Sequence, residues 1–200
     1  MNPPHRLRFL LATQNKGKVR EIRLALSRFE IETESLENYK GLPDAQETGS
    51  TFAENARLKA QHYHKLTGIP TLAEDSGLVV DGLGGEPGIH SARFAPTDKK
   101  RVAKLLELMD SFSDEAARTA RFISALCLIL PHRVIEVVGE VQGRITRAPQ
   151  GDQGFGYDPI FSYPPLEKTF AQMTMEEKNS ISHRATALKK LVKELEEISG

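Results

Sequence analysis

The chain has 200 residues, a length that suits one domain and leaves room for two lobes around a cleft. Hydrophobic residues make up 39% of it, enough for a core, while Lys+Arg and Asp+Glu both number 27. The formal net charge is therefore zero, which argues against a surface that attracts nucleic acid or anionic membranes as a whole. We expect any anion to be bound by a local cluster of cations.

Cysteine usage points to a reducing compartment. The one cysteine, Cys127, excludes an internal disulfide, and its apolar surroundings in the sequence favour a core position over a catalytic thiol. No secretory leader or transmembrane span is recognisable. We expect a soluble cytoplasmic protein that binds neither nucleic acid nor membranes.

The first predicted elements are a strand, a polar turn and a helix. Residues 9–12 are apolar and typical of a buried strand, and the turn covers residues 13–18. The helix is indicated by four apolar residues at helical spacing, Val19, Ile22, Leu26 and Phe29. After a loop, Thr51 and Glu54 fit a capping box, which predicts a helix over residues 52–66.

The later elements include longer strands. Residues 99–109 are predicted to be helical, and residues 120–130 and 133–141, separated by Pro131-His132, are typical of a β-hairpin. An amphipathic helix is expected over residues 185–198. Because strands and helices do not alternate strictly, we predict an α/β fold with a mixed sheet and helices packed around it, not a doubly wound sheet.

The most informative motif is Glu74-Asp75-Ser76-Gly77. Its two acids follow a short apolar run, and a second apolar run and the glycine-dense residues 82–88 come after them. Adjacent carboxylates at the end of a buried strand are costly without a cation. Such oxygen ligands suit Mg²⁺, which is often held by one or two carboxylates plus substrate phosphates. The motif favours a phosphate-handling enzyme in which one acid binds Mg²⁺ and one, or the same one, takes a proton from water. A simple turn or cap is the alternative.

Two other polar segments offer groups for a phosphate or a metal. The turn before the first helix contains Thr13, Gln14, Asn15, Lys16, Gly17 and Lys18. Backbone donors and cations in such a turn suit an anion, although the turn is not a Walker A loop, and an ordinary solvated turn is the alternative. Glu47 lies in a loop from which it can reach a metal, and Asn55 and Lys59 share one helix face. Taken alone, this second set is better explained as a charged loop beside a solvated helix face.

One further motif offers contacts to a nucleobase, and another concentrates hydrogen-bond donors. Phe155 lies between two glycines, where its ring can stack on a base, and Asp158 can accept hydrogen bonds from a base edge. An aromatic ring packed under its own loop is the alternative. Three donors precede the last helix, namely Lys178, His183 and Arg184.

Taken in order, these motifs resemble the inosine triphosphate pyrophosphatase family, which hydrolyses non-standard purine nucleoside triphosphates. The matching motifs cover nearly the whole chain and are Thr13-x-Asn15-x-x-Lys18, Glu47-Thr48-Gly49, Phe52-x-Glu54-Asn55-x-x-x-Lys59-Ala60, Glu74-Asp75-Ser76-Gly77-Leu78, Leu83-Gly84-Gly85-x-Pro87-Gly88, Ser91-Ala92-Arg93, Gly154-Phe155-Gly156-Tyr157-Asp158-Pro159 and Ser182-His183-Arg184. The resemblance implies a single two-lobed domain over residues 1–200, with an elongated central sheet, an active-site cleft between the lobes, and a homodimer. It also implies Mg²⁺-dependent hydrolysis of ITP, dITP or XTP to the monophosphate and pyrophosphate, which cleanses the nucleotide pool.

The same resemblance assigns roles to individual residues. Asp75 is the expected general base and, with Glu47, a ligand of Mg²⁺. The expected triphosphate contacts are Thr13, Gln14, Asn15, Lys16, Gly17, Lys18, Lys59 and Ser76. The expected contacts to the base and sugar are Phe155, Gly156, Tyr157, Asp158, Lys178, His183 and Arg184. Donors such as Lys178 and Arg184 would favour the C6 oxygen of hypoxanthine or xanthine over the amino group of adenine. Glu74 stands where the family often has Asp, and its role stays open.

Two other functions stay open from the sequence. One is a pyrophosphatase that acts on other modified nucleoside triphosphates, because a fold alone does not decide the substrate. The other is a non-enzymatic nucleotide- or RNA-binding module, suggested by Lys189, Lys190 and Lys193 in the last helix. Glutamates follow these lysines closely, so a solvated helix face explains the charges better.

Overall fold

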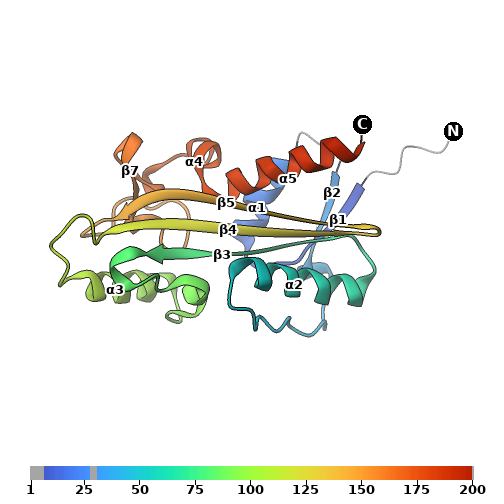
Figure 1. Cartoon of the computed structure of the whole chain (residues 1–200), viewed down its shortest axis with the longest axis horizontal. Coiled ribbons are helices and arrows are strands. Elements are labelled where there is room, and N and C mark those ends of the chain that lie inside the picture. The colour runs from blue at the N-terminus through green and yellow to red at the C-terminus, as the bar shows by residue number, and fades with distance from the viewer. Residues whose placement is uncertain (1–6, 28–30, 200) are drawn as a thin grey trace. The chain divides into compact units, whose positions relative to one another are not determined.

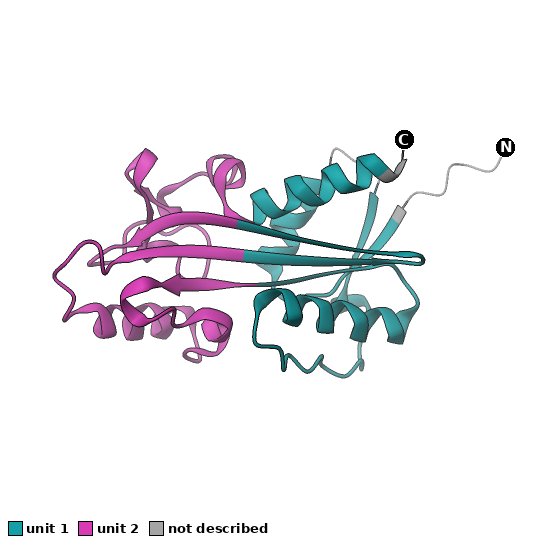
Figure 2. Ribbon diagram, viewed as in Figure 1, with its two compact units in different colours: residues 1–75, 124–139, 184–200 teal, residues 76–123, 140–183 magenta. Residues whose placement is uncertain are grey.

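The chain divides into two compact units (Figure 2). The structure is a computed structural model that describes residues 7–27 and 31–199, so the predicted helix position Phe29 lies outside the described residues. Unit 1 comprises Met1–Asp75, Ser124–Gly139 and Arg184–Gly200, and unit 2 comprises Ser76–Ile123 and Glu140–His183. The first strand, the first two helices and the last helix belong to unit 1.

Within the described residues, seven strands form one sheet in the order β2-β1-β3-β4-β5-β6-β7 (Figure 1). The strands are β1 Leu7–Leu11, β2 Ile31–Ser35, β3 Thr71–Val80, β4 Thr119–Leu130, β5 Arg133–Ile145, β6 Phe161–Tyr163 and β7 Lys168–Thr169. Strand β1 is parallel to both β2 and β3, whereas β6 is antiparallel to both β5 and β7. The predicted mixed sheet is therefore confirmed. Strands β4 and β5 are neighbours joined by the Pro131-His132 turn, as expected of a hairpin.

The α-helices of the described residues are α1 Lys16–Leu26, α2 Phe52–Thr67, α3 Asp98–Met109, α4 Met175–Ile181 and α5 His183–Ser199. The predicted capping box begins α2, since Thr51 and Glu54 each accept a hydrogen bond from the other's backbone N–H. Gly68 ends this helix in the left-handed conformation, with φ 70°. No helix in residues 7–27 or 31–199 combines the length and the apolar character that a membrane crossing requires.

In unit 1, strands β1, β3 and β4 are buried on both faces. Phe9 and Leu11 pack on one face with residues of α1 and α5, whereas Leu10 and Ala12 pack on the other face with residues of α2. Burial on both faces explains why these strands are continuous apolar runs in the sequence. Cys127 lies in the second cluster, where burial raises the pKa of its thiol to about 12, which confirms the expected core position.

Unit 2 has a core of its own. Residues of β3 and the apolar face of α3 form one side of this cluster, and three aromatic rings continue it. The ring of Phe161 lies 4.5 Å from that of Phe122 and 4.9 Å from that of Phe170, measured between centroids. Two predicted base-binding residues of unit 2 contact these rings. Lys178 Nζ lies 5.7 Å from the centroid of Phe170, and the His183 ring stacks on Phe122 with centroids 4.8 Å apart.

The structure differs from the predicted elements in three places. Strand β2 is not expected from the sequence, because its residues are mostly polar and only Ser35 is buried. Glu74 and Asp75 do not end a strand, since β3 continues through them without a break. Lys16–Lys18 belong to the first turn of α1 and not to the preceding turn, because the Asn15 side chain caps the helix. The acids inside β3 require compensating cations, and the site supplies them.

Candidate active site

Three buried charged side chains of unit 1 form an ion-pair network. Arg184 of α5 is 2% exposed, and its Nε donates to both carboxylate oxygens of Glu74 in β3 at 2.9 Å. Its Nη1 donates to the carboxylate of Glu21 in α1. Burial alone disfavours the charged guanidinium, but Glu74 and Glu21 more than offset it and raise the pKa of Arg184. Arg184 is therefore a permanent cation that compensates two buried acids.

Two lysines lie beside the same strand. Lys18 Nζ is 4.0 Å from Glu74 Oε2, and Lys59 Nζ donates to the main-chain oxygen of Glu74 at 3.1 Å. Lys59 Nζ also forms an ion pair with Glu47 at 2.5 Å. Burial lowers the pKa of Lys18, and Glu74 offsets part of this effect by favouring the charged amine. Both lysines retain a partly exposed side chain, so they can reach an anionic ligand.

Asp75 occupies the centre of this group. Burial raises the pKa of its carboxyl, Lys59 and Lys18 act in the opposite direction, and Glu47 adds to the rise. Among the residues that the structure describes, no group forms a hydrogen bond to the buried oxygen Asp75 Oδ2. A buried carboxylate oxygen without a partner is costly, so its position fits an atom that is supplied by a ligand or a metal.

Glu47 and Asp75 are chemically suited to Mg²⁺. Within the described part of the chain, no three His, Cys, Asp or Glu side chains gather as a metal site. A magnesium ion does not require such a cluster, because one or two carboxylates and the phosphates of a substrate often suffice. The unsatisfied oxygen of Asp75 and the nearby charge of Glu47 fit this smaller ligand set.

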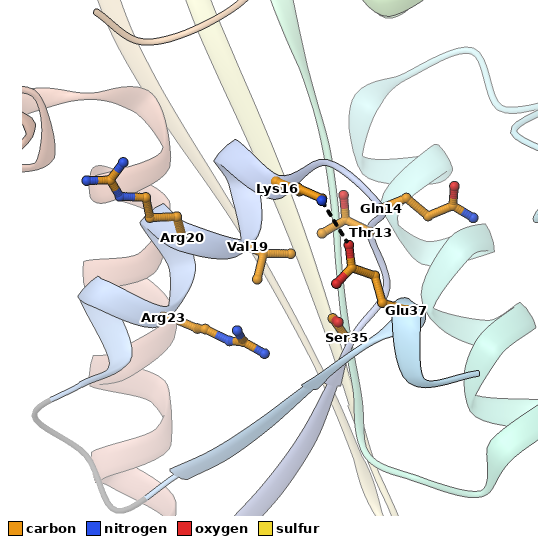
Figure 3. A pocket seen from close by; sticks show the side chains of 8 residues that line it. All are labelled: Thr13, Gln14, Lys16, Val19, Arg20, Arg23, Ser35 and Glu37. Atoms are coloured by element: carbon orange, nitrogen blue, oxygen red, sulfur yellow. Dashed lines mark ion pairs between the residues drawn. The ribbon is translucent and has the colours of Figure 1, made fainter. Parts of the chain in front are cut away.

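The residues of the predicted phosphate turn lie in two different environments. Asn15 Oδ1 accepts a hydrogen bond from Lys18 N–H at 3.1 Å, and Thr13 Oγ1 accepts one from Asn15 N–H at 3.2 Å. Thr13, Gln14 and Lys16 line a cavity of about 370 Å³ (Figure 3), where Lys16 pairs with Glu37 at 3.8 Å. Lys18 does not line this cavity and lies instead next to Glu74. The structure thus brings Lys18, Lys59, Glu47 and Asp75 together, whereas Thr13, Gln14 and Lys16 line the cavity beside Glu37.

The predicted base-binding residues of unit 2 form a second cluster. Lys178 Nζ donates to Asp158 Oδ2 at 2.7 Å and lies 4.8 Å from the centre of the Phe155 ring. The backbone N–H of Phe155 donates to the same Asp158 oxygen at 2.9 Å. Lys178 and Asp158 are buried, whereas Phe155 is only partly buried. The cluster therefore presents an aromatic ring next to a fixed ammonium group.

The loop that carries Phe155 needs its glycines. A Cβ at Gly154 would lie 2.1 Å from Asp158 Oδ2, and Gly154 has φ 78°, so a side chain is excluded both by space and by conformation. Gly156 N–H donates to Asp98 Oδ2 at 2.8 Å, which anchors the loop to the first turn of α3. Asp98 is thus a supporting residue that the sequence analysis did not identify.

Three other residues that are predicted to contact the base are held by contacts within the protein. Tyr157 is 4% exposed, and its hydroxyl donates to the main-chain oxygen of Ser91 at 2.9 Å. His183 is buried with its ring stacked on Phe122, the centroids being 4.8 Å apart. Arg184 is paired with Glu74 and Glu21 in unit 1. These contacts give Tyr157 a packing role and Arg184 a charge-compensating role, and the expected contacts of all three residues to the base stay predictions. Ser76 is half-buried within β3.

A profile of the Ham1 family matches residues 9–194 of the chain. The chain belongs to the Ham1 family. A curated relative, the dITP/XTP pyrophosphatase of Geobacillus kaustophilus, is 50% identical over 195 residues, which cover 96% of this chain and 95% of the relative. The dITP/XTP pyrophosphatase of Symbiobacterium thermophilum is 49% identical over 190 residues and covers 94% of each chain.

Solved structures of Ham1 proteins share the fold. The HAM1 protein from Coxiella burnetii matches with a TM-score of 0.86 and 41% identity, covering 96% of this chain and 99% of that one. The Staphylococcus aureus Ham1 protein matches with a TM-score of 0.83 and 37% identity, covering 94% and 98% of the two chains. The family resemblance stated from the motifs is thereby confirmed.

Glu21 is a second residue of this Ham1 chain that the sequence analysis missed. It lies three residues after Lys18, on the same face of α1, and it is buried. An acid on the apolar face of a helix is a readable signal, because it requires a buried partner. The identity of that partner, Arg184, is not readable, since the two residues are 163 positions apart.

Proposed function

We propose that the protein hydrolyses the non-standard purine nucleoside triphosphates ITP, dITP and XTP to the monophosphate and pyrophosphate. The observation that carries the proposal is the position of Asp75, a buried carboxylate close to two lysines and a second acid. Related proteins also support the proposal, since two relatives that are 50% and 49% identical over nearly their whole length are named dITP/XTP pyrophosphatase.

Magnesium is the proposed cofactor, with Glu47 and Asp75 as its protein ligands. When bound, it neutralises phosphate charge and polarises the phosphoryl group. Two carboxylates and a triphosphate together provide the oxygen ligands that this ion prefers.

Lys18 and Lys59 bind the triphosphate in this proposal. Their ammonium groups neutralise the ground-state charge and stabilise the charge that develops on the leaving pyrophosphate. Glu74 does not touch the substrate. Its carboxylate favours the protonated form of the buried Lys18, and Arg184 in turn compensates Glu74.

Asp75 is the proposed general base. In its ionised form it accepts a proton from a water molecule while the water oxygen attacks the α-phosphorus. The bond from the α-phosphorus to the oxygen that bridges to the β-phosphorus then breaks, and pyrophosphate leaves with that oxygen. Water and ITP are thereby converted to IMP and pyrophosphate, with the proton held on Asp75 until solvent removes it.

The cluster of unit 2 is proposed to bind the purine. The ring of Phe155 stacks on the base, and Lys178, oriented by Asp158, donates to the C6 oxygen. Adenine carries an amino group at that position, which leaves the ammonium group without an acceptor and disfavours ATP. The same proposal includes further substrate contacts by Thr13, Gln14, Asn15, Lys16, Gly17, Ser76, Gly156, Tyr157 and His183.

The decisive experiment measures pyrophosphate release from ITP, dITP, XTP, ATP and GTP, in Mg²⁺ and in EDTA. We expect rapid release from the first three nucleotides, slow release from ATP and GTP, and none in EDTA. Faster hydrolysis of another modified nucleoside triphosphate would show that the enzyme acts on a different substrate class. Tight, salt-sensitive RNA binding without any hydrolysis would favour the binding module instead.

The proposal also covers properties that follow from the family resemblance. They are a homodimer, a cytoplasmic location, and a single two-lobed domain with an active-site cleft. Light scattering of the purified protein tests the dimer, because a monomeric mass at assay concentration contradicts it.

Replacement of Phe155 by alanine should raise KM for ITP about tenfold or more and change kcat much less. Base–aromatic stacking is worth about 1–3 kcal/mol, and the base lies away from the reacting phosphate, so the loss falls on binding. Initial-rate kinetics check this. Phe94→Ala, which removes a partly buried ring from another segment of unit 2, is the control. An unchanged KM would indicate that the Phe155 ring only packs under its own loop and does not stack on the base.

Replacement of Lys59 by glutamine should move the acidic limb of the kcat/KM profile to higher pH. Burial raises the pKa of Asp75, and Lys59 is the strongest of the groups that lower it. Without this ammonium group, a higher pH is needed to ionise the base, so activity is lost sooner on acidification. Rate profiles from acidic to neutral pH test the shift, with the exposed Lys65→Gln on the same helix as the control. A shift to lower pH would contradict the assignment of Asp75.

A further inference from the structure

A buried amide is bonded to the loop that carries Glu47 and acts on Asp75, the two acids that are proposed to bind the metal. Asn55 is in the first turn of α2, and its side chain is 0% exposed. Its Oδ1 accepts a hydrogen bond from Gly49 N–H at 2.8 Å. Gly49 follows Glu47 by two residues, so this bond ties the loop that carries Glu47 to the start of α2.

The same amide also acts on Asp75. Because the backbone N–H of Gly49 needs an acceptor, Oδ1 is fixed on the side of the loop and the Nδ2 donor is on the opposite side. Burial raises the pKa of Asp75, and the Asn55 amide is among the nearby groups that lower it. Asn55 Nδ2 and Asp75 Oδ2 are both buried, and neither has a hydrogen-bond partner within the described residues.

Gly49 is part of the same arrangement. A Cβ at this position would lie 2.9 Å from Asn55 Oδ1 and 2.6 Å from the Cβ of Glu54. Both distances are shorter than a van der Waals contact, so any side chain at position 49 displaces the loop from α2. The glycine is therefore required by the close approach of the loop to Asn55.

We propose that Asn55 is a positioning residue that sets the separation of Glu47 and Asp75 for a shared divalent cation. It holds Glu47 through the backbone of Gly49 and directs its Nδ2 donor at Asp75. The inference rests on the proposed function and deepens it, because that function assigns the cation to these two acids. Magnesium demands near-ideal coordination geometry, so the loss of either link weakens metal binding. Nucleotide binding without metal depends on Lys18 and Lys59. Lys59 pairs with Glu47, but within the described residues neither lysine bonds to Asn55 or Gly49.

Two variants test the two halves of this arrangement. Asn55→Ala removes both links, and Gly49→Ala keeps the amide but displaces the loop. Residues that orient metal ligands typically contribute about 10–100-fold to metal affinity, so each variant should raise the Mg²⁺ concentration for half-maximal activity about tenfold or more. Calorimetric titration with Mg²⁺ alone should show the same loss of affinity. The affinity for ITP in EDTA should be close to that of the unchanged protein.

The control is Gln61→Ala, which shortens an exposed amide on the same helix and should leave all three quantities unchanged. Thermal unfolding shows which variants are folded. If Asn55→Ala does not fold because it loses a buried side chain, Gly49→Ala still tests whether the arrangement sets the Mg²⁺ affinity. An unchanged Mg²⁺ affinity in a folded variant overturns the inference. An equal loss of metal-free ITP binding also overturns it, since it shows a general structural role. If the unchanged protein binds Mg²⁺ but does not hydrolyse ITP, the proposed function fails while the calorimetric comparison still decides the role of Asn55.

Discussion

Replacement of Asp75 by asparagine is expected to lower kcat for ITP about 10³-fold or more. The amide has nearly the same shape as the carboxylate but cannot accept a proton from water at neutral pH, and general-base catalysis contributes about 10²–10⁴-fold. The variant also loses one proposed metal ligand, which adds to the effect. Stopped assays of pyrophosphate release, at saturating Mg²⁺, measure the loss.

Binding of ITP by the same variant separates chemistry from affinity. Lys18 and Lys59 are unchanged, and removing one negative charge beside them reduces the repulsion of a triphosphate. We therefore expect the dissociation constant of ITP in EDTA to change far less than kcat. Asp44→Asn, in an exposed loop of unit 1, is the matched control and should be fully active. Near-normal turnover by Asp75→Asn with saturating Mg²⁺ would remove Asp75 from the role of base.

Local signals in the sequence predict many of the elements well. The capping box at Thr51 and Glu54 places the start of α2, and Gly68 places its end, because both depend only on neighbouring residues. The hairpin turn at Pro131-His132 is readable for the same reason. Strand β2 is not readable, since most of its side chains are exposed or half-exposed and its place is set by pairing with β1.

Some features of the candidate site are likewise predictable from local sequence, and others depend on distant residues. Asn55 and Lys59 share a helix face by their spacing, and the structure places both next to Asp75. The continuation of β3 through Glu74 and Asp75 depends on a partner 110 residues away, Arg184, which no local pattern identifies. Long-range compensation of charge therefore explains why two acids read as the end of a strand from the sequence. It also gives Arg184 a charge-compensating role that no local pattern indicates.

Replacement of Arg184 by alanine is expected to destabilise the protein by about 3–5 kcal/mol, because it leaves the buried Glu74 and Glu21 without their cation. For a chain of this length, roughly 2–4 °C of melting temperature correspond to each kcal/mol, so the fall should be large in thermal unfolding. Arg133→Ala is the matched control. Arg133 pairs with Glu194 at 2.9 Å, but the pair is about half exposed and worth about 0–1 kcal/mol.

A combined variant distinguishes charge compensation from other roles of Arg184. Replacing a whole buried ion-pair group by uncharged residues of similar volume is often neutral, so Arg184→Met with Glu74→Gln and Glu21→Gln should recover much of the lost stability. The ratio of ITP to ATP hydrolysis should stay the same in any of these variants that fold, because the base contacts are proposed to lie in unit 2. Normal stability of Arg184→Ala together with an eroded preference for ITP would instead return Arg184 to a direct contact with the C6 oxygen of the base.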